Sequence, residues 1–152
     1  MVDVVDQATR SRMMAGIRHR DTKPEREIRS LLHRAGYRFR LGRKDLPGKP
    51  DIVLPKFKAV VFVHGCFWHG HECPMFKWPA TRAAFWRAKI RGNVERDGRV
   101  ERELRALDWR LLKVWECALR GRRARTPQYL SSGMAKWLQS KRSRFEITGK
   151  AA

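Results

Sequence analysis

The chain has 152 residues, a length that suits one domain with a modest hydrophobic core. It contains 35 lysines and arginines against 15 acidic residues, so its formal net charge is +20 and its isoelectric point is near 11.3. This excess predicts a polyanionic partner, most simply nucleic acid, in preference to a generally basic, solvated surface. No run of 18 apolar residues is present, so no membrane span is expected, and the N-terminus lacks a secretory signal pattern. Three cysteines in such a chain fit the reducing cytoplasm.

Residues 1–23 are predicted to form an arm with a short helix. Asp6 can cap this helix, which would run from Ala8 to Ile17. Its apolar side chains, Met14 among them, are interspersed with arginines. Two interpretations are open at this point, because the methionines could dock the helix on the domain or the arginines could clamp it on DNA.

The domain itself is predicted over residues 24–140, beginning with a helix. Thr22 can cap that helix, Pro24 lies near its first turn and Gly36 ends it. Its buried face is expected to contain the apolar residues Ile28, Leu31, Leu32 and Ala35.

Short strands and two more helices follow. The strands are predicted over residues 37–41, 51–54, 59–64 and 111–115, and the last helix over 126–139. A helix capped by Thr81 would begin near Arg82 and run to Leu107, and it can break at Gly92 or Gly98. Its core stripe would be Ala83, Trp86, Ile90 and Val94. Residues 141–152 are predicted to be a basic, disordered tail.

The strands 51–54 and 59–64 are separated by a short gap and predict a hairpin. Antiparallel pairing would bring Asp51, at the start of the first strand, beside Val63 and His64 at the end of the second. A carboxylate and a backbone carbonyl are hard oxygen ligands, so this corner suits Mg²⁺.

The stretch 63–73 concentrates three of the five histidines and two of the three cysteines of the chain. A zinc site is predicted here, because Zn²⁺ prefers four tetrahedral sulfur and nitrogen ligands. The four candidate ligands are Cys66, His71, Cys73 and Cys117. The alternative is a set of buried free thiols, which are common in protein cores, while a disulfide is less favoured in a reducing compartment.

The same residues resemble a known family, the very short patch repair (Vsr) endonucleases. The resemblance rests on Asp51, His64, the run Gly65–His69, His71 and Cys73. Further matching segments, in the same order along the chain, are Ala8–Ser11, Pro79–Arg82, Asn93–Asp97 and Trp115–Arg122.

The resemblance implies an α/β fold with a restriction-endonuclease-like core, in which helices flank a mixed central sheet. That fold usually has a Pro-Asp pair, present here as Pro50–Asp51, and an acid-x-Lys motif in the next strand. The second motif is missing, because the strand ends Val63–His64. Histidine takes its place throughout the resembled family, so this departure does not argue against nuclease activity.

The implied chemistry is Mg²⁺-dependent hydrolysis of a phosphodiester bond. Asp51 and the Val63 carbonyl would hold Mg²⁺, and His69 would act as general base, since an imidazole titrates near neutral pH. His64 would assist at the same phosphate. Glu25 has two interpretations, as an accessory catalytic acid by resemblance or as a first-turn acid that stabilises its helix.

The resemblance also implies a set of DNA contacts. Three aromatic residues would enter the base stack from the major groove, Met14 would press toward the mismatch from the minor groove, and two polar residues would contact the mismatched pair. These are Phe67, Trp68 and Trp86 for the stack, and Lys89 and Asn93 for the pair. A place in the core for Trp86, and a solvated helix face for Lys89 and Asn93, remain as alternatives.

The expected function is therefore a strand-specific nick 5′ to the T of a T:G mismatch, of the kind that deamination of 5-methylcytosine produces. Two rival functions stay open: a zinc-stabilised DNA-binding module without nuclease activity, and a restriction-type nuclease acting on paired DNA. The chain is expected to be a bacterial cytoplasmic monomer associated with the nucleoid when bound to double-stranded DNA. MutL-like repair proteins are a further candidate partner.

Overall fold

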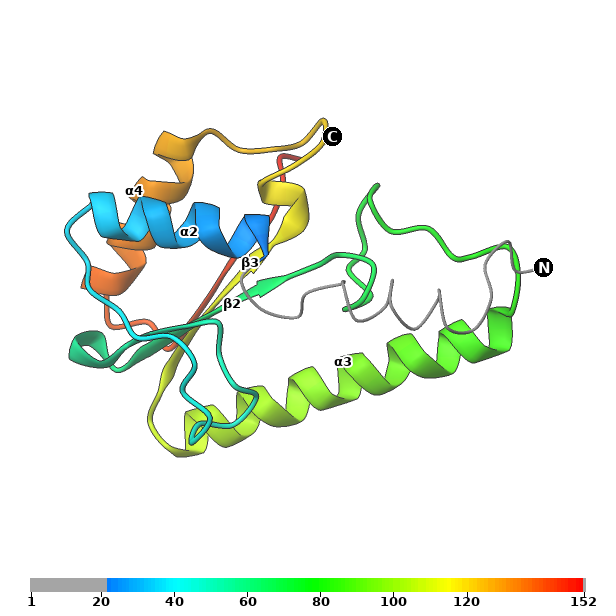
Figure 1. Cartoon of the computed structure of the whole chain (residues 1–152), viewed down its shortest axis with the longest axis horizontal. Coiled ribbons are helices and arrows are strands. Elements are labelled where there is room, and N and C mark those ends of the chain that lie inside the picture. The colour runs from blue at the N-terminus through cyan, green and yellow to red at the C-terminus, as the bar shows by residue number, and fades with distance from the viewer. Residues whose placement is uncertain (1–21, 152) are drawn as a thin grey trace.

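The computed structural model describes residues 22–151, which form a four-stranded mixed sheet with helices on both faces (Figure 1). The predicted arm, including Met14, lies outside the described residues, except for Thr22 and Lys23 at the start of the first described helix. The helices are α2 (Lys23–Arg34), α3 (Ala83–Ala106) and α4 (Pro127–Gln139), with short 3-10 helices η1 (Pro55–Phe57) and η2 (Glu116–Ala118). The strands are β1 (Ile52–Leu54), β2 (Ala59–His64), β3 (Arg110–Trp115) and β4 (Arg144–Ile147).

The sheet has the order β1-β2-β3-β4. β1 and β2 pair antiparallel, which confirms the predicted hairpin, whereas β2–β3 and β3–β4 pair parallel. The hairpin turns through η1 and Lys58, whose φ of 51° is left-handed. The predicted mixed sheet with flanking helices is therefore confirmed.

Each face of the sheet has its own core, because successive side chains of a strand point to opposite faces. One face packs against α2 and α4 through buried residues that include Ile28, Leu32, Met134 and Trp137. The other face packs against the C-terminal half of α3, where Leu104 is fully buried. Figure 1 shows α2 and α4 on one side of the strands and α3 on the other. Among the described helices, none is long and apolar enough to cross a membrane.

The helix starts follow from their caps. Thr22 and Thr126 accept hydrogen bonds from the backbone N–H groups three residues ahead, at 3.4 and 3.1 Å, and a proline follows in each first turn. The cap at Thr22 confirms the predicted helix start, and the last helix lies within its predicted range of 126–139. Ala35 is exposed instead of buried, because the helix ends at Arg34 and the chain turns away through Gly36 at φ 95°.

Three predictions for α3 were wrong. The helix begins after Arg82, which has a left-handed φ of 54° and makes no side-chain cap, so Thr81 does not start it. It runs for 24 residues without a break. Its N-terminal half extends past the sheet (Figure 1), which explains why Ile90 alone of the expected core stripe is buried.

Two strand predictions also change. The predicted strand 37–41 contributes a single antiparallel bridge, between Arg40 and Val53. The prediction of a disordered tail was wrong. Arg144–Ile147 form the edge strand β4, and Ile147 is only 3% exposed. The alternation of Phe145 and Ile147 is short and lies among basic residues, and so it gave a weak strand signal.

The edge strand should be needed for stability. We expect that ending the chain after Lys141 lowers the free energy of unfolding by about 3 kcal/mol or more, because truncating one buried isoleucine already costs about 2–5 kcal/mol. Urea titration followed by circular dichroism would measure the change. A chain lacking only residues 151–152 is the control, and equal stability of the two shortened chains would contradict a structural role for β4.

Candidate functional site

A cleft of about 790 Å³ opens where β1 begins and β2 ends. The register of the hairpin brings Asp51 to this point, where its Oδ2 accepts a hydrogen bond of 2.7 Å from the N–H of Val63. The predicted approach of Asp51 to the end of β2 is thereby confirmed. Besides the candidate catalytic residues, basic side chains line the cleft: Arg29, Arg43, Lys44, Lys49 and Arg96.

Asp51 is a carboxyl group in an unfavourable environment for charge. Burial raises its pKa to about 7, and the charge of Glu25 adds to this effect, while the Val63 N–H and Arg29 oppose it. Glu25 itself is only 6% exposed and faces the same cleft, although it also occupies the first turn of α2. Two buried carboxyl groups at one place are a suitable environment for a divalent cation, which would favour their ionised forms.

Two histidines face each other beside Asp51. The rings of His64 and His69 are parallel within 2°, with centroids 3.7 Å apart. Burial lowers the pKa of His64, and the charges of His69 and Lys113 lower it further, so His64 is neutral at physiological pH. Among the described residues no partner binds its buried Nδ1.

His69 is oriented by a carboxylate from α3. Its Nδ1 lies 2.6 Å from Oδ2 of Asp97. In the tautomer that donates the Nδ1–H of His69 to the Asp97 carboxylate, Nε2 is the ring nitrogen that can take a proton. The arrangement is that of a base with an orienting acid.

Asp97 is a candidate site residue that the sequence alone does not indicate. In the sequence it is only the last residue of the matching segment Asn93–Asp97. Its distance of 28 residues from His69 carries no periodic signal, because the contact depends on how α3 crosses the sheet.

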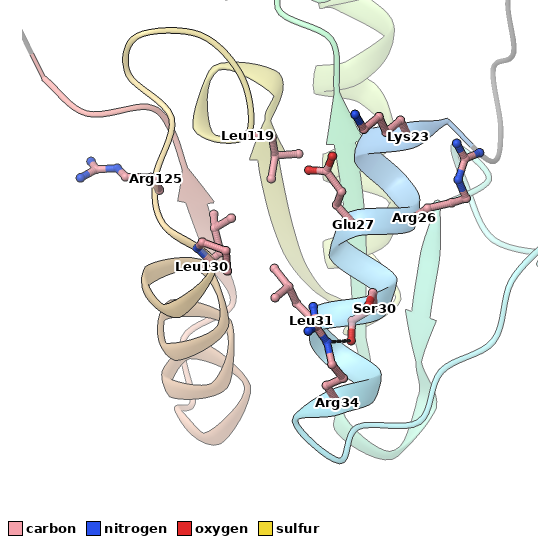
Figure 2. A pocket seen from close by; sticks show the side chains of 10 residues that line it. Lys23, Arg26, Glu27, Ser30, Leu31, Arg34, Leu119, Arg125 and Leu130 are labelled. Atoms are coloured by element: carbon pink, nitrogen blue, oxygen red, sulfur yellow. Dashed lines mark hydrogen bonds between the residues drawn. The ribbon is translucent and has the colours of Figure 1, made fainter.

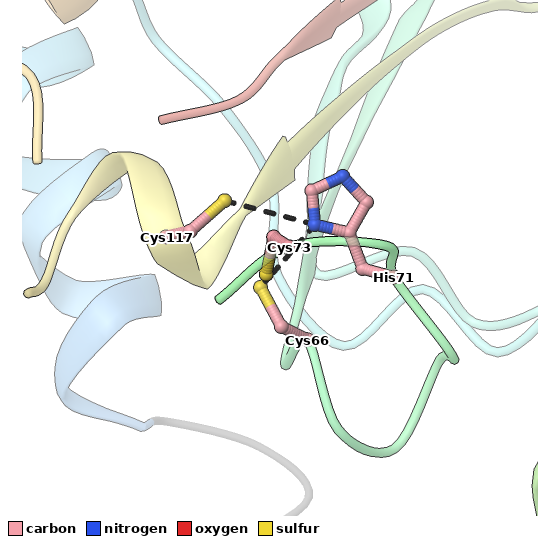
Figure 3. A group of neighbouring side chains, drawn as sticks. All are labelled: Cys66, His71, Cys73 and Cys117. Atoms are coloured by element: carbon pink, nitrogen blue, oxygen red, sulfur yellow. Dashed lines mark hydrogen bonds between the residues drawn. The ribbon is translucent and has the colours of Figure 1, made fainter. Parts of the chain in front are cut away.

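A second cluster lies next to the cleft. The ligand atoms of Cys66, His71, Cys73 and Cys117 all lie within 4.8 Å of one another (Figure 3). Nδ1 of His71 is 3.5 Å from Sγ of Cys66 and 3.6 Å from Sγ of Cys117. All three cysteines are free thiols, which removes the disulfide alternative.

The donor set of this cluster fits a metal ion. Cys66 and Cys117 are 0% and 2% exposed, and burial raises the pKa of the Cys66 thiol, so the thiolate has little solvent to stabilise it. Burial also lowers the pKa of His71, which keeps its imidazole in the neutral form that ligates metals. Three sulfurs and one nitrogen at such separations can surround one ion. The fold thus brings together the four residues that were predicted as zinc ligands.

Trp115 lies between the two clusters. Its ring stacks on His71 with centroids 4.0 Å apart, and it meets His64 edge-on at 5.4 Å. Its Nε1 donates a hydrogen bond of 2.6 Å to Glu146 on β4. The edge strand therefore holds the ring that lies between the cysteine cluster and the stacked pair of His64 and His69.

The three aromatic residues predicted to enter DNA form one group. Phe67 lies 5.2 Å from Trp68 and 5.4 Å from Trp86 between ring centroids, and the two tryptophans are 5.9 Å apart. All three are half-buried, so Trp86 belongs to this surface group and not to the sheet core. We call Phe67, Trp68 and Trp86 the aromatic wedge.

The two predicted polar contacts differ in their surroundings. Lys89 is exposed on α3. Asn93 is half-buried, and its side-chain amide donates a hydrogen bond of 2.9 Å to the carbonyl of Trp68. Asn93 therefore holds the loop of the aromatic wedge, a role that the sequence did not indicate.

A second cavity, of about 570 Å³, lies between α2 and α4 (Figure 2). Leucines 31, 119 and 130 and several basic side chains line it. It contains none of the predicted site residues, and α2 separates it from Asp51, since Glu25 and Arg29 face the larger cleft. The chemistry thus concentrates in the larger cleft.

Comparisons with known proteins agree with this site. A family model described as DNA mismatch endonuclease Vsr matches residues 2–75. DNA mismatch endonuclease Vsr of Escherichia coli (strain K12) is 50% identical over 138 residues, which cover 91% of this chain and 88% of the relative. Type II nicking enzyme V.XorIIP of Xanthomonas oryzae pv. oryzae (strain KACC10331 / KXO85) is 50% identical over 119 residues, 78% of this chain and 88% of the relative. Type II nicking enzyme V.NaeI of Lentzea aerocolonigenes is 45% identical over 118 residues, which cover 72% of this chain and 68% of the relative.

The raised pKa of Asp51 has a consequence for stability. The native state keeps the Asp51 proton up to a pH of about 7, whereas the unfolded chain loses it near the ordinary value of 3.8. The contribution of Asp51 to the free energy of unfolding therefore falls as pH rises between these values, by up to about 4 kcal/mol. Asp51→Asn cannot ionise and should lack this fall.

The measurement is denaturant unfolding of both proteins in magnesium-free buffer at about pH 5 and about pH 8. Titration of all other groups is common to the two proteins, so the difference between their unfolding free energies isolates Asp51. We expect the variant to gain stability relative to the parent at the higher pH. A difference independent of pH would contradict the raised pKa.

Proposed function

Because the chain belongs to the Vsr family of DNA mismatch endonucleases, as the identity over nine-tenths of its length shows, we propose that it nicks DNA 5′ to the T of a T:G mismatch. It is a DNA endonuclease, a hydrolase of phosphodiester bonds. The observation that best supports a hydrolytic centre in this chain is the meeting of Asp51, His64 and the His69–Asp97 pair in one basic cleft.

His69 is the proposed general base. With its Nδ1–H donated in a hydrogen bond to the Asp97 carboxylate, Nε2 can take a proton from the attacking water, and the Asp97 carboxylate then stabilises the imidazolium. The water oxygen bonds to phosphorus, the bond to the 3′ oxygen breaks, and the products are a 5′ phosphate and a 3′ hydroxyl. His64 stacks on His69 and limits how its ring can turn.

Mg²⁺ is the proposed catalytic ion, held by Asp51 and the Val63 carbonyl, with Glu25 as an accessory acid. When bound, it supplies charge neutralisation at the phosphoryl oxygens. A buried carboxyl whose pKa reaches about 7 fits this role, since a cation would stabilise its ionised form. The Val63 N–H holds the other side of the carboxylate in a fixed orientation.

We propose that the domain belongs to the restriction-endonuclease-like class. Pro50 and Asp51 precede β1, and a mixed sheet with a parallel β2–β3–β4 part follows. The site differs from the usual one in that His64 ends β2 where an acid-x-Lys motif is common.

The ion proposed for the cysteine cluster is a structural Zn²⁺. Cys66, His71, Cys73 and Cys117 would fill a tetrahedral shell, which leaves no position for water or substrate. Such a site would tie the loop after β2 to η2, and His69 lies within that loop. The ion would thus support the position of the base.

The DNA contacts follow from the aromatic wedge. A T:G wobble pair is easier to unstack than a Watson–Crick pair, so inserting three rings costs less there. Lys89 and Asn93 are the proposed contacts to the mismatched bases, although Asn93 also holds the Trp68 carbonyl. Met14 in the N-terminal arm is proposed to act from the minor groove.

The proposed partner is double-stranded DNA in a bacterial cytoplasm, where the protein would associate with the nucleoid. We propose a monomer, because one asymmetric mismatch needs no twofold symmetry. Stimulation by MutL-like repair proteins is a further expectation of the family.

The zinc assignment is tested by Cys73→Ala. We expect the bound zinc to fall from about one ion per chain to nearly none, and the unfolding temperature and the nicking activity to fall with it. Elemental analysis and thermal unfolding measure the first two effects independently of activity. His33→Ala is the control, because His33 is an exposed histidine outside the cluster. A folded, fully active Cys73→Ala protein without zinc would contradict the zinc assignment.

The function is tested with two labelled duplexes that contain the recognition sequence of a cytosine methyltransferase. They differ only in that one has a T:G mismatch in this sequence, and each is incubated with Mg²⁺ or with EDTA. We expect Mg²⁺-dependent nicking of the T strand of the mismatched duplex alone. Asp51→Ala and His69→Ala should lower the rate by about 10²-fold or more while DNA binding survives, and Asp97→Asn should lower it by a smaller factor.

Two other results would each support a rival. Equal cutting of both duplexes would indicate a restriction-type nuclease. Binding in several mismatch contexts without any cut would indicate a zinc-stabilised DNA-binding module.

A further inference from the structure

The aromatic wedge is the inner part of a larger aromatic cluster. Phe67 also stacks on Phe76, with centroids 5.8 Å apart and planes at 25°, and Phe76 meets Trp78 edge-on at 4.8 Å. On the other side Trp86 meets Phe85 at 5.2 Å. The cluster therefore extends from the wedge in two directions and ends in Trp78 and Phe85.

These two outer rings are open to solvent. Trp78 is 50% exposed and Phe85 is 47% exposed. Each carries a guanidinium over its ring, Arg87 at 5.7 Å from the Trp78 centroid and Arg82 at 4.3 Å from the Phe85 centroid. Single exposed apolar residues are common on protein surfaces. These two rings, however, continue the aromatic wedge, which is itself proposed to enter DNA.

The charge of this region indicates the kind of ligand that it can bind. Residues 73–94 contain five basic side chains and no acidic one. A surface of this charge is complementary to a polyanion.

The chemistry of the pairs narrows the ligand to a nucleotide strand. An aromatic ring accepts a base or a deoxyribose against its face or edge, and every base has such a surface, so this contact is independent of sequence. A guanidinium beside the ring binds the phosphate of the same nucleotide. Contacts of these two kinds, to the face of a base and to a phosphate, do not read the donor and acceptor pattern on the base edges.

We propose that Trp78 with Arg87 and Phe85 with Arg82 form a second DNA contact, which holds the nucleotides that flank the mismatch whatever their sequence. This inference rests on the proposed function, since it assumes that the aromatic wedge enters the duplex at the mismatch. The wedge would set the preference for a mismatch, while the outer contact would add affinity for any DNA placed there.

The test measures Kd by fluorescence anisotropy for two labelled duplexes of the same flanking sequence, one with T:G and one with T:A. Trp78→Ala and Phe85→Ala should each raise Kd about tenfold for both duplexes, so that the ratio of the two Kd values is unchanged. Trp78→Phe should recover most of the affinity, because it keeps an aromatic face. Arg87→Ala should lower the slope of log Kd against log salt by about 1.

The chain offers a matched control on another element. Tyr129 on α4 is also an exposed ring, 48% exposed, with the Arg125 guanidinium 4.3 Å from its centroid. Tyr129→Ala should leave both Kd values unchanged. Circular dichroism and the unfolding midpoint of each variant show that the fold is retained.

Several outcomes would overturn the inference. Unchanged Kd values for Trp78→Ala and Phe85→Ala would do so, as would a loss of the same size in Tyr129→Ala. A loss confined to the T:G duplex would assign the outer rings to the wedge and would also contradict a separate contact.

The inference and the proposed function fail in different ways. If the parent protein nicks the T:G duplex and the outer-ring variants bind as tightly as the parent, only the inference is wrong. If the parent binds both duplexes and nicks neither, the proposed function is wrong, while the Kd comparison still decides whether the outer rings contact DNA.

Discussion

The hydrogen bond from the Val63 N–H to the Asp51 carboxylate is the constraint on which the site depends. It exists because β1 and β2 pair antiparallel in one register, so that the residue before β1 lies beside the end of β2. A slip of one residue would turn the side chains of β2 to the opposite face and remove His64 from the cleft. The buried cores on both faces of the sheet, with Val53 and Val60 on one and Ile52 and Val61 on the other, prevent such a slip.

Around this fixed pair, the site is assembled from segments distant in the chain. α3 supplies Asp97 to orient His69, and the end of β3 supplies Trp115, which packs against both His64 and His71. β4 in turn holds Trp115 through Glu146. The C-terminal strand is thus connected to His64 by two contacts, which is a larger role than its short length and edge position would indicate.

The cleft combines groups that are costly to bury. The charge of Glu25 disfavours ionisation of the buried Asp51, and His64 has a buried ring nitrogen without a partner among residues 22–151. Strained or poorly satisfied polar groups of this kind concentrate at functional sites, because function and not stability selects them. The strands β1, β2 and β3, most of whose residues are buried, supply the rigidity that keeps these groups in place.

Much of this protein was determined by local sequence. The threonine caps and prolines set the starts of α2 and α4, the hairpin follows from two apolar runs with a short gap, and the crowded cysteines and histidines predicted their own cluster. The sequence motifs also identified the family, because Asp51, His64, His69 and the cysteines are close in the chain or have distinctive neighbours.

Only the tertiary structure decided the rest. The His69–Asp97 pair, the contact of Asn93 with Trp68 and the position of Trp115 between two clusters all join residues from different elements. The same holds for β4, which is a strand because it pairs with β3, although its sequence alone resembles a basic tail. Local sequence determines the conformation of a segment and which of its faces is apolar. It does not determine which distant segment will cover that face, because that choice depends on the free energy of packing of the whole chain.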